Sequence, residues 1–508
     1  MKVLLIYPPR RIWPFINEGD NYLLPQSLVC LGAYLRERGL DVKIIDCMPL
    51  KLGWKSLSNL IREEKPDVVG VGESHAVYID EALKLIKLVK EINPKIITVG
   101  GGGHFTNLAE EIMSSLPYLD FVVRGEGERS FYELLEAISL RKGFDKVKGI
   151  VFREGNKIIT NLPAPLIENL DSLPIPAYDL VPMDLYGRTK YLFSPGGITI
   201  HHSRGCTSRC SFCVWWTQMA ERKNFDGKEV LFPKWRTKSV DKTMEEIEIL
   251  YKKYNKRCLI FVDDSWNIDP KWNEEFADEF IKRKFKINWF AFMRIDCIMR
   301  DEELGIFEKL VRSGLSHISV GIERVEDDDL KEMKKHFYKR EITERCIKLI
   351  RKKYPQVFIQ GTFIVGTRNE TKNSLWKQFE FAKRLKIDYP AFHPLTPVPG
   401  TELYEIYKKN NWLEITDFSY YDWMTPVASS IYMKREEIED ELVKMNLKYV
   451  RIPWLLRGLL SPYKYKRRMY IWWLLTSLKV LWETTKARLN PLHWENITGL
   501  KKPEWYMD

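Results

Sequence analysis

Short apolar runs alternate with amphipathic stretches over the first 146 residues. The runs are three to five residues long and end at polar or glycine positions, a pattern typical of strands buried on both faces of a parallel sheet. They lie at residues 3–7, 42–46, 68–72, 96–99 and 121–123, with helical periodicity at 25–38, 57–64, 78–92 and 130–140. This strict alternation predicts a doubly wound, Rossmann-like α/β domain over residues 1–146.

A second alternation of strands and helices begins at Gly196 and continues to about residue 400. Residues 147–195 before it combine a hairpin pattern with a connector rich in Pro and Asp, which we interpret as a linker. Residues 401–508 have mostly helical periodicity and are rich in tryptophan. The six predicted strands lie at residues 198–201, 259–262, 288–292, 318–321, 358–364 and 389–393, and the helices at 244–254, 272–284, 301–313, 342–353 and 372–385.

The composition is that of an ordinary globular protein. The chain has 508 residues, 45% of them apolar, so about two to four domains are expected. Its eight cysteines show no paired spacing, which fits a reducing cytoplasm, and the first apolar run is too short for a secretory signal. A formal net charge of +11 is compatible with nucleic acid or with an anionic membrane and by itself decides neither.

Three cysteines stand close together directly after the first strand of the second alternation. Cys206, Cys210 and Cys213 have the spacing Cx3Cx2C within HHSRGCTSRCSFCVWW. Three thiolates at this spacing can hold a [4Fe–4S] cluster and leave its fourth iron open, whereas most electron-transfer clusters use four cysteines. The alternatives are a structural zinc site or incidental buried cysteines, but the other five cysteines are scattered and supply no second ligand pair.

This triplet, with the aromatic Phe212 before its last cysteine, resembles the radical S-adenosylmethionine (SAM) superfamily. The resemblance implies that residues 196–400 form the family's partial (β/α)6 TIM barrel, with the cysteines on the catalytic face. It also implies that SAM binds the open iron and, on receiving one electron, yields a 5′-deoxyadenosyl radical that takes hydrogen from an unactivated C–H bond. The electron is expected from a reductant of the flavodoxin or ferredoxin type.

Polar and glycine residues follow the later barrel strands where this family binds SAM. By the resemblance, the two acids after the second strand face the methionine moiety, and residues of the fourth strand face its ribose and carboxylate. The stretch GTFIVGTRNE resembles the family's GxIxGxxE stretch near adenine, although Phe363 precedes Ile364. Acids at strand ends also cap helices, so none is specific alone. The predicted SAM residues are Phe212, Asp263, Asp264, Arg294, Ser319, Glu323, Ile364 and Gly366.

The first domain resembles the cobalamin-binding domain that precedes many radical SAM domains. The motif PxxLxxLxxYLxxxGxxVxxxD is matched by Pro25, Leu28, Leu31, Tyr34, Leu35, Gly39, Val42 and Asp46. Glycines at the carboxyl edge of the sheet let a ligand approach the backbone. The predicted cobalamin residues are Ser74, His75, Gly101, Gly102, Gly103, His104, Gly125, Glu126 and Gly127.

The mode of cobalamin binding is less defined by the sequence. The DxHxxG signature of a cobalt-ligating histidine is missing, and residues 8–24 contain no histidine, so cobalamin is expected base-off. We interpret His75 and His104 as hydrogen-bonding loop residues rather than cobalt ligands. A degenerate domain without cofactor is the alternative.

The last segment joins a basic cluster to a tryptophan-rich apolar stretch. Residues 464–468 read KYKRR, and the stretch 469–482 that follows is too short to span a bilayer and is interrupted by Lys479. Aromatic residues beside Lys and Arg suit a membrane interface, so residues 455–482 are a candidate for peripheral contact with the inner face of the membrane or for covering a lipid-like substrate. A buried helix packed on the barrel is the alternative. RNA binding is disfavoured because the cations form no polar stripe.

The two resemblances imply a cobalamin-dependent radical SAM methyltransferase acting on an unactivated carbon of a small, hydrophobic, lipid- or isoprenoid-like substrate. A radical SAM enzyme that forms a C–C bond or a ring without methyl transfer is one alternative, and a non-catalytic cobalamin or cluster sensor is another. A methylthiotransferase acting on tRNA would need a second cysteine triplet, which Cys30 and Cys47 cannot supply. We therefore expect a cytoplasmic enzyme without a nucleic-acid partner. The sequence assigns no residue to the substrate.

Overall fold

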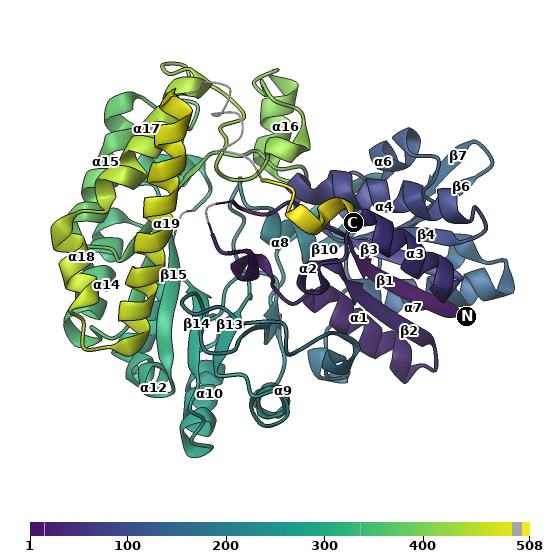
Figure 1. The fold of residues 1–508 in the computed structure, drawn as a ribbon, viewed down its shortest axis with the longest axis horizontal. Helices are drawn as coiled ribbons and strands as arrows, with labels where there is room; N and C mark the ends of the chain where they lie inside the picture. Colours follow the sequence, from purple (N-terminus) through teal and green to yellow (C-terminus); the bar gives the residue numbers. More distant parts are fainter. Residues whose placement is uncertain (15, 336, 490–499) are drawn as a thin grey trace.

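Two mainly parallel sheets, each with its own helices, lie side by side in the protein (Figure 1). The computed structural model describes residues 1–14, 16–335, 337–489 and 500–508. One cluster of buried apolar side chains runs from the first sheet into the second and includes Val3, Tyr178 and Ile198. The two sheets therefore share a continuous core, which fixes how their edges face each other.

The first sheet has seven strands in the order β2-β1-β3-β4-β5-β6-β7. Its first five strands pair in parallel, as predicted from their unbroken apolar runs, and β6 and β7 add an antiparallel hairpin at one edge. The hairpin predicted within the linker thus continues the first sheet. The strands are β1 (Lys2–Tyr7), β2 (Asp41–Asp46), β3 (Val68–Gly72), β4 (Ile97–Gly101), β5 (Phe121–Val123), β6 (Ile150–Glu154) and β7 (Lys157–Thr160). The helices are α1 (Gln26–Glu37), α2 (Cys47–Leu50), α3 (Trp54–Glu64), α4 (Ile79–Ile92), α5 (Gly103–Asn107), α6 (Ala109–Ser115) and α7 (Gly127–Leu140).

The second sheet has six parallel strands in sequential order, β8-β13-β14-β15-β16-β17. The two outer strands, β8 (Gly197–Ile200) and β17 (Tyr389–Pro394), do not pair within the described part of the chain, so the sheet is an open (β/α)6 barrel. The inner strands are β13 (Cys258–Phe261), β14 (Asn288–Met293), β15 (Leu315–Glu323) and β16 (Phe358–Val365). The covering helices are α9 (Val240–Lys252), α10 (Pro270–Lys282), α11 (Ile295–Glu303), α12 (Ile306–Arg312), α13 (Asp327–Glu332), α14 (Arg340–Lys353) and α15 (Lys372–Arg384).

Two details of the barrel differ from the sequence prediction. The helix predicted over residues 301–313 is divided between α11 and α12, because Gly305 adopts a left-handed conformation with φ of 74°. The segment between β8 and α9 also contains short structure that no apolar run announced. It comprises β9 (Ser203–Arg204), α8 (Val214–Gln218), the hairpin of β10 (Glu221–Phe225) and β11 (Lys228–Phe232), and β12 (Arg236–Thr237), which pairs with β9.

The carboxyl-terminal segment is helical, as predicted, and its last long helix packs on the barrel. The helices are α16 (Glu402–Lys409), α17 (Arg435–Tyr449), α18 (Ile452–Leu459) and α19 (Lys464–Leu489). The hydroxyl oxygen of Tyr465 in α19 lies 3.3 Å from Nδ1 of His317 in β15. Trp472 Nε1 donates a 3.2 Å hydrogen bond to Asp20 Oδ2 of the first domain. Residues 490–499 of this predicted segment lie outside the described residues. None of the described helices has the length and apolarity that a membrane span requires.

Candidate active site

The cysteine triplet lies in a loop at the carboxyl end of the first barrel strand, where the sequence predicted it. We call residues 205–213 the cluster loop. Gly205 at its start has φ of 84°, and a Cβ there would lie 2.0 Å from the backbone oxygen of Lys234, so only glycine fits. The loop ends where α8 begins, and the carbonyl oxygen of Cys210 accepts hydrogen bonds from Cys213 N (3.2 Å) and Trp216 Nε1 (3.1 Å).

The three thiols of the cluster loop are partly buried, and Cys210 lies near two cations. Burial raises the pKa of the Cys213 thiol well above its usual range and also raises the pKa of Cys210. The Lys335 and Arg294 cations act in the opposite direction on the pKa of Cys210. Binding to iron removes the thiol protons, and the cations offset the resulting negative charge. The donor set therefore fits an iron–sulfur cluster.

The described residues contain no group of three or more His, Cys, Asp or Glu side chains placed around a single metal position. Such a group describes a mononuclear site of the zinc type. Cysteine ligands of an iron–sulfur cluster are instead distributed over its several irons.

Arg294, predicted to bind SAM, fastens the cluster loop. Its Nη1 donates to Thr207 Oγ1 (3.0 Å) and Ser208 Oγ (2.8 Å), two side chains between the first two cysteines. Its Nη2 pairs with Asp296 at 2.7 Å. Because these bonds connect the end of β14 to the loop, Arg294 holds the loop above the barrel.

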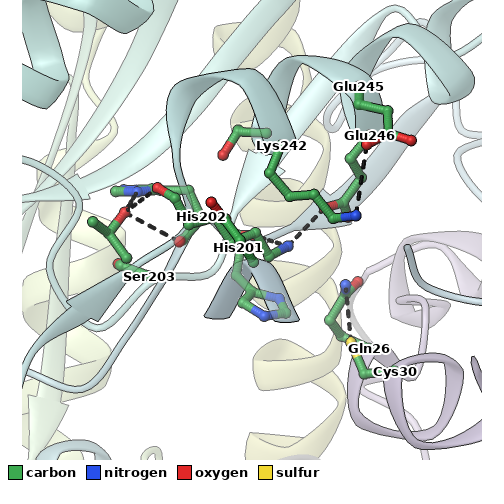
Figure 2. Close-up of polar contacts among 12 residues, drawn as sticks. Gln26, Cys30, His201, His202, Ser203, Lys242, Glu245 and Glu246 are labelled. Atoms are coloured by element: carbon green, nitrogen blue, oxygen red, sulfur yellow. Dashed lines mark hydrogen bonds and ion pairs between the residues drawn. The ribbon is translucent and has the colours of Figure 1, made fainter. Parts of the chain in front are cut away.

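The neighbouring acids Asp263 and Asp264 differ in their surroundings. Asp263 is 2% exposed, and its Oδ1 accepts from His202 N (3.0 Å), Ser203 N (2.6 Å) and Ser203 Oγ (2.5 Å). Figure 2 labels the two donor residues, His202 and Ser203. Its Oδ2 is buried without a hydrogen-bond partner among the described residues. Asp264 is half-buried, and burial together with Asp263 raises the pKa of its carboxyl to about 7. Asp263 therefore positions the chain leading to the cluster loop, and Asp264 is the more accessible acid.

A buried lysine that sequence reasoning missed holds the end of β8. Lys238 Nζ donates to the carbonyl oxygen of His201 (2.8 Å) and pairs with Glu246 of α9 at 2.6 Å. Figure 2 labels these two partners, His201 and Glu246. Tyr178 of the linker donates to the same carboxylate at 2.5 Å. The linker, α9 and the strand before the cysteines are thereby joined by one polar network. No sequence spacing pairs a lysine with a carbonyl group far along the chain.

The predicted SAM residues of β15 face a second buried cation. Glu323 pairs with Lys335 at 2.9 Å, and Lys335 also donates to the carbonyl oxygen of Gly321 at 2.7 Å. Thr362 of β16 lies 3.4 Å from both carboxylate oxygens of Glu323. Ser319 Oγ is buried with no hydrogen-bond partner among the described residues. Lys335 carried no signal in the sequence, and it brings positive charge next to Cys210.

The predicted adenine-side residues are held by an ion pair. The carbonyl oxygen of Ile364 accepts from Arg324 Nη1 at 3.0 Å, and Gly366 N donates to Glu370 at 3.1 Å. Arg324 and Glu370 form a fully buried salt bridge. Gly366 has φ of 75° and packs against Ile438 of α17, so its glycine requirement is conformational. Phe212 is partly buried and packs beside Ile364 in one apolar cluster.

The carboxyl edge of the first sheet is formed largely by backbone. We call residues 73–75, 101–104 and 124–127 the first-domain edge. Ser74 Oγ accepts from Gly103 N at 3.2 Å, which ties two of its loops. Gly102 has φ of 88°, and a Cβ there would lie 2.7 Å from the carbonyl oxygen of Glu73. Gly125 has φ of 75° with open space where a Cβ would be. These positions can cradle a ligand through backbone groups.

The two histidines of the first-domain edge are neutral at physiological pH. Burial lowers the pKa of His75 and of His104 to about 4. The His75 ring lies 5.1 Å from that of Trp215 in α8 and 5.4 Å from that of Trp423. The ring of His104 lies 4.9 Å from that of Phe418. Both histidines are packed among aromatic rings, and His104 lies in the helix α5 rather than in a loop. That neither histidine ligates cobalt stays a prediction.

Glu126, predicted to bind cobalamin, is engaged in an ion-pair cluster between the domains. Its carboxylate is 2.7 Å from Arg204 and 2.9 Å from Arg236, and it accepts from Ile167 N at 2.7 Å. Glu128 also pairs with Arg204, at 2.5 Å. A buried carboxylate needs such partners to remain charged. Glu126 therefore fixes the β9–β12 pair of the barrel against α7, a role that its place in a glycine-rich turn did not indicate.

The first-domain edge and the cluster loop face each other directly. The side chain of Gln218, in the helix after the loop, covers Gly103 so closely that a Cβ there would lie 2.4 Å from it. Gln218 Nε2 is buried and has no hydrogen-bond partner among the described residues. Asn107 Nδ2 donates to the carbonyl oxygen of Pro399 at 3.0 Å beside this contact. An unsatisfied amide above a glycine-lined edge fits a polar cofactor between the domains.

Comparisons with known proteins agree with this division. The B12-binding domain model matches residues 13–135, and the radical SAM superfamily model matches residues 200–382. An uncharacterized methyltransferase of Pyrococcus horikoshii is 32% identical over 457 residues, covering 89% of this chain and 93% of that protein. The chain belongs to the radical SAM superfamily, in the branch that carries a B12-binding domain. The predicted family is confirmed, and the protein is a radical SAM enzyme.

Other relatives and solved structures of this radical SAM branch support the fold. The anaerobic magnesium-protoporphyrin IX monomethyl ester cyclase of Rubrivivax gelatinosus is 28% identical, covering 89% of this chain and 79% of that enzyme. The methyltransferase TsrM from Kitasatospora setae, solved with cobalamin and a [4Fe-4S] cluster, superposes with a TM-score of 0.67 at 16% identity over 97% of this chain and all of that chain. OxsB, solved with aqua-cobalamin and SAM, gives 0.70 at 15% identity over 98% and 83%. The predicted three-part architecture is confirmed.

Proposed function

We propose that this radical SAM enzyme transfers a methyl group to an unactivated carbon of an apolar small molecule. When bound, the cluster with SAM supplies a 5′-deoxyadenosyl radical, and cobalamin supplies the methyl group. Cys206, Cys210 and Cys213 would hold the cluster. Asp264 would face the ammonium group of SAM, to which a carboxylate is complementary. The glycines of the first-domain edge would hold cobalamin.

The observation that carries the proposal is the contact between the two edges. His75 of the first-domain edge touches Trp215, which lies two residues after Cys213. Gly103 is covered by Gln218 of the same helix. A methyl carrier on one edge and a radical source on the other would thus meet over one substrate position, which a methyl transfer to a carbon radical requires.

An apolar substrate is favoured by the barrel's inner strands. Val262 directly follows β13, and Phe292 is the second-last residue of the adjacent strand β14, yet each is 40% exposed. Trp215 in α8 is 37% exposed. Large apolar side chains left open at the carboxyl end of a barrel offer contact area to an apolar ligand. Relatives named as a hopanoid C-3 methylase and as magnesium-protoporphyrin ester cyclases suggest lipid-like or tetrapyrrole substrates.

Ring formation without methyl transfer is the second candidate. It is favoured by three relatives named as cyclases, at 25–28% identity. The same cysteines and SAM residues would serve both reactions. The products made from SAM distinguish the two reactions. A methyl transfer would release both 5′-deoxyadenosine and S-adenosylhomocysteine, whereas a cyclisation would release 5′-deoxyadenosine alone.

The test is a product balance with the anaerobically reconstituted enzyme, methyl-deuterated SAM, hydroxocobalamin and a one-electron reductant such as flavodoxin. A panel of isoprenoid lipids and tetrapyrroles supplies the substrate. We expect 5′-deoxyadenosine and S-adenosylhomocysteine in about equal amounts, with a product carrying the deuterated methyl group. 5′-Deoxyadenosine without S-adenosylhomocysteine would select the cyclising alternative. Absence of SAM cleavage with an intact cluster would select a sensor.

A further inference from the structure

The short helix α18 exposes a continuous apolar face. Ile452, Leu456, Leu459 and Leu460 are 72%, 51%, 36% and 76% exposed. Their spacing of i, i+4, i+7 and i+8 places them on one side of the helix. The other side packs inward, because Trp454 is 6% exposed and its Nε1 donates to the carbonyl oxygen of Asp388 at 3.0 Å. The helix is therefore anchored on the barrel by one face and apolar on the other.

The sequence around this face carries cations and no acids. Residues 449–482 contain no Asp or Glu, and their cations are Arg451, Arg457, Lys464, Lys466, Arg467, Arg468 and Lys479. Part of this charge is turned inward. Lys466 pairs with Asp388 at 2.9 Å, and Arg457 Nε donates to Tyr470 at 3.1 Å. The basic cluster predicted to meet lipid headgroups thus partly serves the core.

Two cations remain on the surface at the two ends of the apolar face. Arg451 directly precedes Ile452, and Lys464 follows Leu460 by four residues. Both are exposed, and neither has a carboxylate within salt-bridge distance among the residues that the structure describes. Figure 1 shows α18 at the outer margin of the barrel, on the side away from the first domain. The helix therefore lies at the surface of the barrel, and its apolar side chains are open to solvent.

We propose that the α18 face, defined as Ile452, Leu456, Leu459 and Leu460 with Arg451 and Lys464, docks on an anionic lipid surface. An apolar stripe buries itself among acyl chains while cations at its ends stay with the headgroups. A continuous run of exposed leucines and isoleucine is costly for a protein that stays in water. Cations without carboxylate partners at its ends suit an anionic bilayer. The contact is peripheral and does not depend on which reaction the enzyme catalyses.

The test is flotation of the full chain with vesicles of phosphatidylcholine alone or with phosphatidylglycerol added. The wild type should float with the anionic vesicles. The double variant Leu456→Glu/Leu460→Glu should bind at least about tenfold more weakly, since it places two charges in the apolar face. The variant Arg451→Gln/Lys464→Gln should also bind about tenfold or more weakly to anionic vesicles and lose most of the salt dependence.

Leu475→Glu/Leu478→Glu on α19 is the matched control, because those leucines are 45% and 53% exposed. It should float like the wild type. Thermal unfolding of each variant reports whether the fold is kept. The proposal is overturned if the wild type floats with neither vesicle, or if the α19 control loses binding as much as the α18 variant. A dimer in solution that the α18 variant converts to a monomer would also overturn it, because the face would then contact a second copy.

Discussion

The two edges that meet between the domains present different groups to the space between them. The cluster loop side offers side chains, with three partly buried cysteines, the half-buried Asp264 and the cations Arg294 and Lys335. The first-domain edge offers mainly glycine backbone, while Glu126 is paired away from it. A site built from side chains is marked in the sequence by residue types at a fixed spacing. A site built from backbone groups is marked only by glycines. The cluster loop side could therefore be assigned residue by residue, and the first-domain edge only as a region.

Because the cluster loop side depends on individual side chains, we expect the loss of one cysteine to have the largest effect on SAM cleavage. Cys206→Ala, Cys210→Ala or Cys213→Ala should each reduce iron and sulfide content sharply and bring SAM cleavage to background, because a cluster cannot keep its site-specific geometry on two thiolates. Iron analysis and 5′-deoxyadenosine release measure this. Cys30→Ala, in α1 of the first domain, is the control and should retain both. A triple alanine variant that still held a full cluster would contradict the assignment.

The first-domain edge should instead be sensitive to added bulk. Gly101 has room for a Cβ, whose nearest atom would be the oxygen of Val123 at 3.7 Å. Gly101→Leu should therefore fold, yet extend into the space over the edge and cut cobalamin retention by about 100-fold, with iron content unchanged. Cobalt and iron after desalting are the measurements.

The matched control is Gly19→Leu, because a Cβ at Gly19 also meets its nearest atom, in Thr189, at 3.7 Å. Gly19 lies outside the first-domain edge, so this variant should keep its cobalt. Equal cobalt in the Gly101→Leu and wild-type proteins would show that cobalamin does not use this edge. A wild type that retains no cobalt would support the degenerate-domain alternative.

Substitutions of the adjacent acids Asp263 and Asp264 should distinguish a structural role from a role in binding SAM. Asp264→Ala should leave iron content and unfolding temperature nearly unchanged and lower SAM cleavage about 10- to 100-fold, as for the loss of one charged hydrogen bond. Asp263→Ala leaves Ser203 and the His202 backbone without an acceptor, so it should lower the unfolding temperature and the iron content together. If Asp264→Ala unfolded as readily as Asp263→Ala, the proposed division of roles would be wrong.

The elements that the sequence predicted well are those decided by local patterns. Five strands of the first sheet and six of the barrel lie within about three residues of their apolar runs, because a buried parallel strand must be apolar on both faces. The break between α11 and α12 was missed even though Gly305 marks it. The Trp-rich pattern of α19 fits a buried helix as well as a helix at a membrane interface. Trp472 and Trp473 are buried, so the half of α19 that contains them packs on the barrel.

The parts that could not be predicted depend on partners far apart in the chain. β9 and β12 have two residues each, too few for a periodic signal, and they pair across about thirty residues. Arg204 and Arg236 meet Glu126 only after the two domains pack together. Lys335 reaches Glu323 from a loop without periodicity. Such contacts follow from tertiary packing, so the cysteine spacing predicted the centre of the site and not the charges that surround it.

The smallest expected effect concerns a buried acid at the carboxyl end of β2, in contrast to the accessible Asp264. Asp46 is 1% exposed, accepts from Tyr186 OH at 2.7 Å and from Met48 N at 3.1 Å, and burial raises its pKa to about 7. In the unfolded chain its pKa is about 3.9. Between these values the folded state binds more protons than the unfolded state, so the stability that this group contributes is present below about pH 4 and is lost as pH rises toward 7.

Asp46→Asn should remove that dependence, because the amide is neutral at every pH. Its oxygen can accept from Met48 N, and its NH2 group can donate to the hydroxyl oxygen of Tyr186. From pH 5 to pH 7 the free energy of unfolding of the wild type should fall by about 2 kcal/mol more than that of Asp46→Asn. Denaturant unfolding at the two pH values, followed by near-UV circular dichroism, measures the difference. Asp179→Asn is the control, since that exposed acid is paired with Arg36, which lowers its pKa. Parallel pH profiles for wild type and Asp46→Asn would mean that Asp46 is ionised in the folded protein, and the buried edge of the first sheet would then carry charge as the barrel edge does.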